Sequence, residues 1–237
     1  MDIGKAFGQM FKDPNWVKKM LFFSLFVILS IFIIGIPFVF GYMILMIRGY
    51  MDGDENLPEW QDNWELIIKT GLKFILIMII FSAVSGTVSF FISALFNFAV
   101  ILISQIDGTE FITITLSLVQ MTINIIIGAI VSGINLLIMI KFARDYNFGG
   151  VFDLEWYPSY FNRNWKNIVI YLLLNMVTAS LATFGIIACC IGVLATAFYA
   201  ITVNSSLMAQ IDIHDRGAMS LGNNKELLSE SGSSEVE

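Results

Sequence analysis

Four long stretches of this sequence contain no charged residue. Asp, Glu, Lys and Arg are absent from residues 20–47, 74–106, 111–140 and 168–211. Each stretch is longer than the roughly 20 residues that a helix needs to cross the ~30 Å hydrocarbon core of a bilayer. Charged residues make up 14% of the chain, against about 25% in soluble domains, and the mean hydropathy is +0.78. We therefore expect an all-α, polytopic transmembrane helix bundle.

Breaks within the apolar stretches predict how the helices are connected. Residues 168–211 are too many for one span, and the segment from Phe184 to Gly192, with a glycine near each end, supplies a turn. The segment Asp107-Gly108-Thr109-Glu110 separates two further apolar blocks within residues 67–140. Both regions are therefore expected to form helical hairpins, and the arms of the hairpin around Asp107 are unusually long.

The first apolar stretch, residues 17–47, allows more than one arrangement. It forms either one long tilted helix or two short helices, because Gly35-Ile36-Pro37 lies at its midpoint and proline disfavours helix in the residue before it. If it crosses twice, all thirteen Lys and Arg fall on one side, as the tendency of these residues to stay cytoplasmic requires. The segment from Pro37 to about Tyr50 would span only ~21 Å. A re-entrant hairpin therefore satisfies the charge rule equally well.

The favoured arrangement is about six helices in three hairpins, of which the first either crosses twice or is re-entrant. It predicts a multi-pass protein of the cell membrane with both termini in the cytoplasm. Residues 1–16 are expected to form an interfacial amphipathic segment, because Ile3, Phe7, Met10 and Phe11 fall on one helical face. Residues 17–216 form the transmembrane domain, and residues 217–237 are an acidic tail too poor in apolar residues to order itself.

The dipeptide Asn-Trp occurs three times, at Asn15-Trp16, Asn63-Trp64 and Asn164-Trp165, each time just before an apolar stretch. The simplest interpretation is that Asn caps a helix and Trp anchors it among the lipid headgroups. The predicted interfacial anchors are Trp16, Trp60, Trp64, Trp156 and Trp165.

Several motifs in the charged connectors resemble the prokaryotic membrane family called domain of unknown function 4013. They are Gly4-Lys5-Ala6-Phe7, Phe11-Lys12-Asp13-Pro14-Asn15-Trp16, Asp52-Gly53, Leu57-Pro58-Glu59-Trp60-Gln61-Asp62, Phe142-Ala143-Arg144-Asp145-Tyr146 and Gly149-Gly150-Val151-Phe152-Asp153. The resemblance extends from about Met1 to Gln210. It implies a multi-span protein of archaeal or bacterial cell membranes and supplies no activity.

The sequence offers little for catalysis. Ionisable residues within a membrane mark proton relays and ion paths, and the apolar stretches contain none. Asp212, His214 and Asp215 form a weak metal pattern, and a solvated helix end is the better interpretation. Asp52 and Asp54 resemble the start of a calcium loop, but the late bidentate Glu is missing, which favours a solvated loop. We therefore expect a non-enzymatic protein without a cofactor. The net charge of -6 argues against nucleic acid as a partner.

A polar stripe is the main feature of the apolar stretches. Polar or small residues recur every three or four positions in residues 113–135, so they share one helix face; the candidate residues are Ser117, Gln120, Asn124, Ser132 and Asn135. Asn97, Asn175, Thr178 and Asn204 are candidate partners on other helices.

Two functions remain open. The first is a membrane scaffold or assembly partner, in which the polar stripe holds helices together and the partners are the lipid bilayer and either other membrane proteins or further copies of the chain. The second is a permease or channel for an uncharged or lipid-like solute, which needs a hydrated path lined by Asn124 and Asn135.

Overall fold

The computed structural model describes residues 1–61, 63–106, 108, 110–184 and 189–233, and this part of the chain contains helices and no strand. The helices, in chain order, are α1 (Ile3–Gly8), η1 (Gln9–Lys12), α2 (Trp16–Leu29), η2 (Ser30–Phe32), α3 (Ile36–Met51), α4 (Trp64–Ser104), α5 (Glu110–Asp145), η3 (Gly149–Phe152), α6 (Trp156–Phe184) and α7 (Cys189–Ser233). The all-α class expected from the sequence is therefore confirmed.

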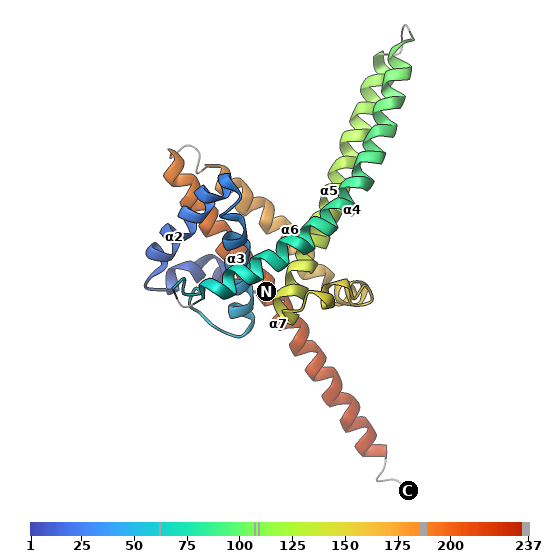
Figure 1. Cartoon of the computed structure of the whole chain (residues 1–237). Coiled ribbons are helices and arrows are strands. Elements are labelled where there is room, and N and C mark those ends of the chain that lie inside the picture. Colours follow the sequence, from blue (N-terminus) through green and yellow to red (C-terminus); the bar gives the residue numbers. More distant parts are fainter. Residues whose placement is uncertain (62, 107, 109, 185–188, 234–237) are drawn as a thin grey trace.

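The molecule consists of a packed body and a long arm, and the C-terminal part of α7 projects from the body away from the arm (Figure 1). The body contains α2, α3, α6, most of α7, the N-terminal half of α4 and the C-terminal half of α5. Fully buried aromatic residues such as Tyr42, Phe74, Phe142 and Phe198 form its core. The remaining halves of α4 and α5 leave the body side by side as the arm. The arm exposes large apolar side chains on all sides, among them Phe90, Leu95 and Ile114. Such a surface is stable in lipid and not in water.

Three helical segments are long and apolar enough to cross a membrane. They are α4, α5 and the Gly192–Ser220 part of α7, and the number is up to four if the bent pair Ile3–Lys12 and Trp16–Phe32 is one span. These helices suit a membrane protein. The described residues thus contain three candidate spans, or up to four, and the six or so helices in hairpins that the sequence predicts are not confirmed.

The first apolar stretch is broken where Gly35-Ile36-Pro37 predicts a break. α2 ends at Leu29, Ile33 adopts the left-handed conformation with a φ of 70°, and α3 begins at Ile36 with Pro37 in its first turn, where proline is favoured. A Cβ at Gly35 would collide with the carbonyl oxygen of Phe26. Glycine at this position therefore lets the chain fold back closely enough for α2 and α3 to pack together.

The contact between α3 and α4 brings two helix backbones together. A Cβ at Gly41 would collide with the carbonyl oxygen of Ile67, and one at Gly71 with that of Pro37. Small residues are what permits such an approach between membrane helices. This contact fixes the first hairpin against the base of the arm.

The N-terminal segment is helical, as expected, but it packs on protein. Ala6 and Met10 are buried, the Asp2 N–H donates to Gln210 Oε1 at 2.6 Å, and the Tyr199 hydroxyl donates to the Phe7 carbonyl at 3.1 Å. Of the apolar face predicted to lie in the interface, Ile3 and Phe11 remain exposed. The face that packs on α7 is therefore rotated from the one predicted to meet lipid.

Only two of the three Asn-Trp pairs lie at a helix start. Asn15 and Asn63 are the residues before α2 and α4, but neither side chain caps its helix with a hydrogen bond. Asn164 lies inside α6, which begins at Trp156, so the predicted side-chain capping is wrong for all three asparagines. At the other end of the chain, α7 continues through residues 217–233, for which the composition predicts a tail, while the turn residues 185–188 lie outside the described residues.

Candidate functional site

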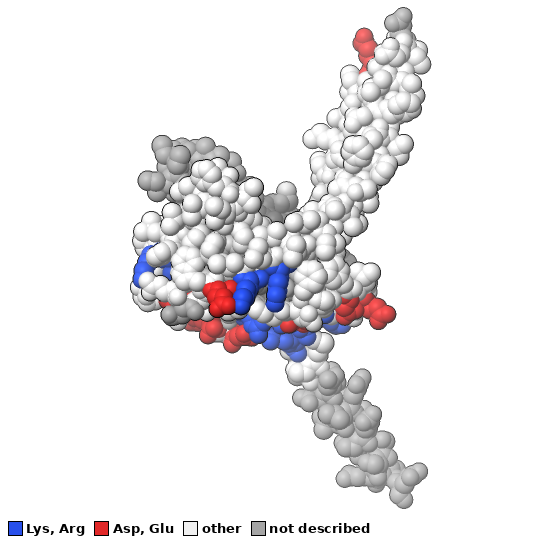
Figure 2. Space-filling view, viewed as in Figure 1, with Lys and Arg blue, Asp and Glu red and all other residues white. Residues whose placement is uncertain are grey.

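Charged side chains gather at one end of the body, where the connectors between helices lie (Figure 2). The surface of the arm is uncharged in this view except near its tip, where Glu110 begins α5. We call the charged region the connector layer; it comprises residues 1–19, 48–73, 141–166 and 212–216. Its buried charges belong to three groups of ion pairs, and two of these groups join segments that are far apart in the sequence.

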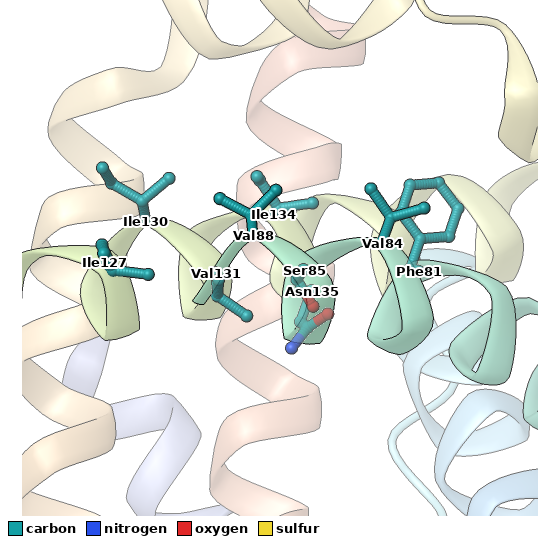
Figure 3. Close-up of a pocket in the computed structure, with 9 residues that line it drawn as sticks. All are labelled: Phe81, Val84, Ser85, Val88, Ile127, Ile130, Val131, Ile134 and Asn135. Atoms are coloured by element: carbon teal, nitrogen blue, oxygen red, sulfur yellow. The ribbon is translucent and has the colours of Figure 1, made fainter. Parts of the chain in front are cut away.

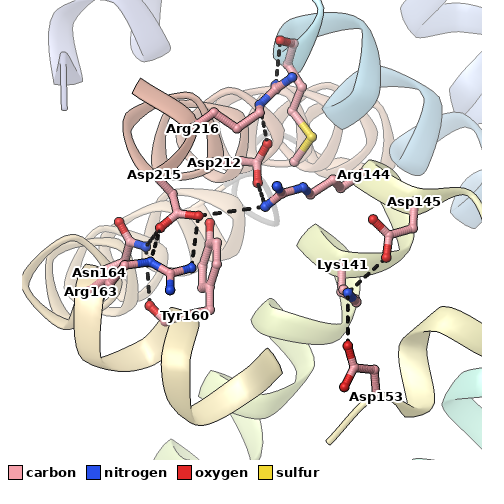
Figure 4. A network of polar contacts seen from close by, with 11 residues as sticks. Lys141, Arg144, Asp145, Asp153, Tyr160, Arg163, Asn164, Asp212, Asp215 and Arg216 are labelled. Carbon is pink, nitrogen blue, oxygen red and sulfur yellow. Dashed lines mark hydrogen bonds and ion pairs between the residues drawn. The ribbon is translucent and has the colours of Figure 1, made fainter. Parts of the chain in front are cut away.

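The first group is centred on Asp215 of α7 (Figure 4). The fully buried Asp215 carboxylate accepts hydrogen bonds from Arg163 Nε and from Asn164 Nδ2, both at 2.8 Å, and lies 3.7 Å from Arg144 Nη1. Arg144 ends α5, and Arg163 and Asn164 lie in α6. This one carboxylate therefore joins three helices.

Asp212 extends the same group towards α3. It is also fully buried and lies 3.5 Å from Arg144 Nη1 and 2.9 Å from Arg216 Nε. Arg216 in turn donates to the carbonyl oxygen of Met51 at 2.8 Å. The expectation that Asp212 and Asp215 belong to a solvated helix end is therefore wrong, because arginines from other helices neutralise them inside the protein.

The metal interpretation of the same motif has no structural support. His214 is exposed, whereas Asp212 and Asp215 are buried. In the part of the chain that the structure describes, no group of three or more His, Cys, Asp or Glu side chains could hold a metal ion.

The second group is centred on Lys19 near the start of α2. Its ammonium is buried and contacts Asp13 at 2.7 Å, Glu59 at 2.6 Å and the carbonyl oxygen of Leu57 at 2.6 Å. Burial alone raises the pKa of Asp13, but hydrogen bonds from Lys19 and from the N–H groups of Asn15 and Leu57 outweigh it and leave this pKa below its ordinary value. The acidic connector before α4 is thereby tied to the first turn of α2.

The third group surrounds Lys141 at the end of α5. Its ammonium lies 3.0 Å from Asp145 and 3.7 Å from Asp153, and 4.8 Å from the centre of the Trp156 ring. Cations placed over an indole face are attracted by its quadrupole. The contact therefore holds η3 and the start of α6 against α5.

The predicted tryptophan anchors have two different environments. Trp60 is 2% exposed and stacks on Tyr42 with ring centres 4.2 Å apart, so the role of lipid anchor does not fit this residue. Trp64 and Trp165 are exposed, and Trp16 and Trp156 are partly buried. These four have the surface that an interfacial anchor requires.

The predicted polar stripe of α5 is divided among several contacts. Gln120 Nε2 donates to Asn97 Oδ1, and Ser93 Oγ donates to Asn124 Oδ1, both at 3.5 Å and both across the arm to α4. Ser117 bonds instead to the carbonyl oxygen of Thr113 in its own helix. The expected partnership with Asn97 is therefore present.

A second polar contact joins α6 and α7. Asn204 Nδ2 donates to Asn175 Oδ1 at 3.1 Å and to Thr178 Oγ1 at 3.3 Å. These three residues are partners for one another and not for the stripe on α5. The sequence identified the residues but could not show which helices would face each other.

Asn135, at the body end of the stripe, lines a groove between α4 and α5 with a volume of about 400 Å³ (Figure 3). Ser85 is its other polar residue; the apolar lining consists of Phe81, Val84, Val88, Ile127, Ile130, Val131 and Ile134. Asn124 and Ser132 are not part of it. The groove is therefore an apolar surface with one polar corner.

Charged residues beside the apolar stretches are what sequence reasoning left without a role. Four charged residues lie within about five positions of such a stretch, and each of them forms an ion pair: Lys19, Lys141, Arg144 and Arg163. Their position beside a membrane span is the signal that could have identified them, because a charge there must either reach the interface or find a partner.

Comparison with known proteins gives a family and no activity. Searches of curated proteins and of solved structures found no match. The motifs quoted above contribute Asp13, Trp60, Arg144, Asp145 and Asp153 to the connector layer. Residues 24–208 match the model of the family described as Protein of unknown function (DUF4013). Since this match covers well over half of the sequence, the chain belongs to that family.

Proposed function

We propose that the protein is a non-enzymatic scaffold of the cell membrane, which inserts helical hairpins from the cytoplasmic side and holds their connectors together as one rigid layer. The ion-pair groups support the rigid layer, because the groups at Lys19 and at Asp215 join segments that are far apart in the sequence, and the group at Lys141 holds the following connector against the end of α5. Its partners are the lipid bilayer and either other membrane proteins or further copies of the chain.

The basic residues support a cytoplasmic connector layer. The described Lys and Arg belong to α1, η1, the start of α2, the end of α3, the start of α4, the end of α5, the first half of α6 and the part of α7 from Arg216 onward. The arm beyond Lys73 and before Lys141 carries neither. Lys and Arg are retained on the cytoplasmic side of membranes. Both termini are proposed to lie on that side.

The first hairpin is proposed to be re-entrant. The charge-free parts of α2 and α3, residues 20–29 and 36–47, rise only ~15 and ~18 Å at 1.5 Å per residue, about half of a ~30 Å hydrocarbon core. The residues 31–34 at its tip are all apolar and between 65% and 78% exposed. A tip without polar side chains, in which the N–H groups of Ile33, Gly35 and Ile36 donate to backbone carbonyls of the same turn, is stable within the hydrocarbon and not at the far headgroups.

The arm is proposed to cross the membrane completely. From Lys73 to the end of α4, and from the start of α5 to Lys141, each helix rises ~45 Å. The sequence between them contains Asp107 and Glu110, which require water or headgroups. Because the arm is longer than the hydrocarbon is thick, it is expected to tilt.

One observation favours the scaffold over the permease. A hydrated path would bring Asn124 and Asn135 to one cavity, but Asn124 is paired with Ser93 on α4, and the groove at Asn135 is lined almost entirely by apolar side chains. Interhelical hydrogen bonds of this kind contribute about 0.6 to 2 kcal/mol each to helix association.

The test is to substitute both asparagines, as Asn124→Leu and Asn135→Leu, in the full chain. The scaffold predicts a changed assembly size or a lower thermal stability in detergent, and no change in solute flux through liposomes, since the native protein carries none. A flux in the native protein that disappears in the double variant while assembly size is intact would show that the protein is a permease.

A further inference from the structure

The connector layer contains a cavity of about 610 Å³ at the point where α3, α4 and the end of α5 meet. Its polar lining residues are Arg48, Asp52, Asp54, Asn56 and Asn63, and Leu45, Leu57, Pro58, Leu66 and Tyr146 complete the lining. Leu45 lies one turn before Arg48 in α3, and Leu66 lies about one turn after Asn63 in α4, so both lie towards the charge-free stretches. The volume is in the range of small-molecule sites, and the lining combines charged with apolar side chains.

Arg48 is the cationic group of this cavity. It is the first charge after the apolar stretch of residues 20–47, and its guanidinium lies 4.6 Å from the centre of the Tyr146 ring. The Tyr146 hydroxyl is itself hydrogen-bonded to Thr70 of α4, so the ring is held in place. Asp52 forms a long ion pair with Arg48 Nε at 3.7 Å, a distance that leaves the two groups without a hydrogen bond to each other. The guanidinium is therefore oriented, and its N–H groups are available to an anion.

Asp54 is a second carboxylate in the lining of the cavity. Residues in the described parts of the chain form no ion pair with it, although they neutralise the nearby Glu55 and Glu59 through Lys12 and Lys19. Its backbone N–H donates to the Gly49 carbonyl at 2.9 Å, which fixes the position of the residue just after the end of α3. The cavity thus presents a guanidinium whose ion pair with Asp52 is long and a carboxylate without an ion pair.

We propose that this cavity binds the headgroup of a zwitterionic phospholipid that carries a primary amine. Arg48 contacts the phosphate, because guanidinium and phosphate are complementary in charge and geometry. Asp54, with Asp52 beside it, accepts hydrogen bonds from the ammonium group, and Leu45 and Leu66 contact the glycerol and the first acyl carbons. The combination of charged and apolar lining residues matches the charged headgroup and apolar chains of the lipid. This inference rests on the proposed position of the connector layer at the membrane surface.

The test measures lipid retention by the full chain after delipidation in detergent. Phosphatidylethanolamine, phosphatidylcholine and phosphatidylglycerol with identical acyl chains are offered at equal concentration, and bound lipid is counted by native mass spectrometry. The native protein is expected to retain phosphatidylethanolamine best. Asp54→Asn should reduce its preference over phosphatidylglycerol about tenfold, because a charge-assisted hydrogen bond is lost. Arg48→Gln should reduce the retention of both lipids.

Lys73→Gln is the matched control, since Lys73 is an exposed cation near the apolar boundary that does not line the cavity. Equal retention of the three lipids by the native protein, or an effect of Lys73→Gln as large as that of Arg48→Gln, would overturn the proposal. So would displacement of the lipid by soluble phosphoethanolamine at equal concentration, which would assign the site to a free phosphate ester.

Asp54 is exposed, so Asp54→Asn should fold even if Arg48→Gln does not. The measurement in detergent does not depend on which face of the membrane the layer occupies, so it can fail independently of the proposed function.

Discussion

Single buried charges determine which connectors of this chain are held together. Lys19 is 3% exposed, and its partners Asp13 and Glu59 belong to two different connectors. A buried pair contributes little relative to apolar packing, but removal of one partner leaves an uncompensated charge and costs several kcal/mol. The pairs therefore determine which connectors pack together, and they add little to the free energy of unfolding.

Substitution of Asp13 with Asn should lower the free energy of unfolding by about 2 to 3 kcal/mol at neutral pH, because Lys19 then keeps only the exposed Glu59 as an ionic partner. Thermal unfolding in detergent, followed by tryptophan fluorescence, measures the change. Glu65→Gln is the control, since the Glu65 pair with Lys69 is exposed to solvent and should leave the midpoint unchanged. Equal effects of the two substitutions would contradict the assigned role of the buried pair.

The same pair predicts a dependence on pH. The pKa of Asp13 lies below its ordinary value of 3.8 in the folded protein. Its carboxylate therefore stabilises the fold above that value, and the contribution is lost as the pH falls through the folded pKa. The difference in midpoint between the native protein and Asp13→Asn should shrink between about pH 5 and pH 3. A difference that stays constant over this interval would exclude ionised Asp13 as its source.

Some residue roles could be predicted from the sequence and others could not. The positions of Trp64 and Trp165 at the edges of apolar stretches indicated exposed tryptophans, and they are exposed. Trp60 has a similar position but is buried against Tyr42. Asp215 is neutralised by Arg163, which is far away in the sequence and lies on a neighbouring helix. Such pairings depend on which helices pack together, and a local pattern carries no information about that.

At the scale of helices, backbone chemistry was a better guide than repeated motifs. Gly35 and Pro37 have direct conformational effects, and the chain breaks there. Asn164 repeats a dipeptide that precedes other helices, but the polar start of α6 extends the helix back to Trp156 and makes Asn164 a buried donor to Asp215. An Asn-Trp pair alone does not require a helix start, whereas a proline constrains the backbone wherever it occurs.

Gly71→Ala tests the close contact between α3 and α4. The added methyl would meet the Pro37 carbonyl oxygen and push the helices apart, which should cost about 2 kcal/mol. Gly86→Ala is the matched control, because Gly86 lies in the same helix with nothing near its missing Cβ. Thermal midpoints in detergent measure both. If Gly86→Ala lowered the stability as much as Gly71→Ala, the collision with the Pro37 carbonyl oxygen would not be the cause of the loss at Gly71.

At the scale of the whole molecule, one end is charged and ion-paired and the rest is suited to lipid. The body reaches its full width near the connector layer; α4 and α5 extend far beyond it as the arm, and the C-terminal part of α7 projects from the body away from the arm (Figure 1). The apolar stretches predicted this division, because a charge-free run of that length has few stable environments other than a bilayer. The length of each hairpin could not be predicted from the apolar stretches, because α2 ends at Leu29, well inside its stretch.

The central claim is that the hairpins enter from one face and reach different depths. It is tested most directly by labelling single cysteines with a membrane-impermeant thiol reagent in oriented liposomes. Asp54→Cys, Ile34→Cys and Glu110→Cys are introduced one at a time into a chain in which Cys189 and Cys190 are serine. The account predicts labelling at position 54 from the face that carries the N-terminus, at position 110 from the opposite face, and at position 34 from neither. Labelling at position 54 from the face opposite the N-terminus, or at position 34 from the same face as position 110, would contradict it.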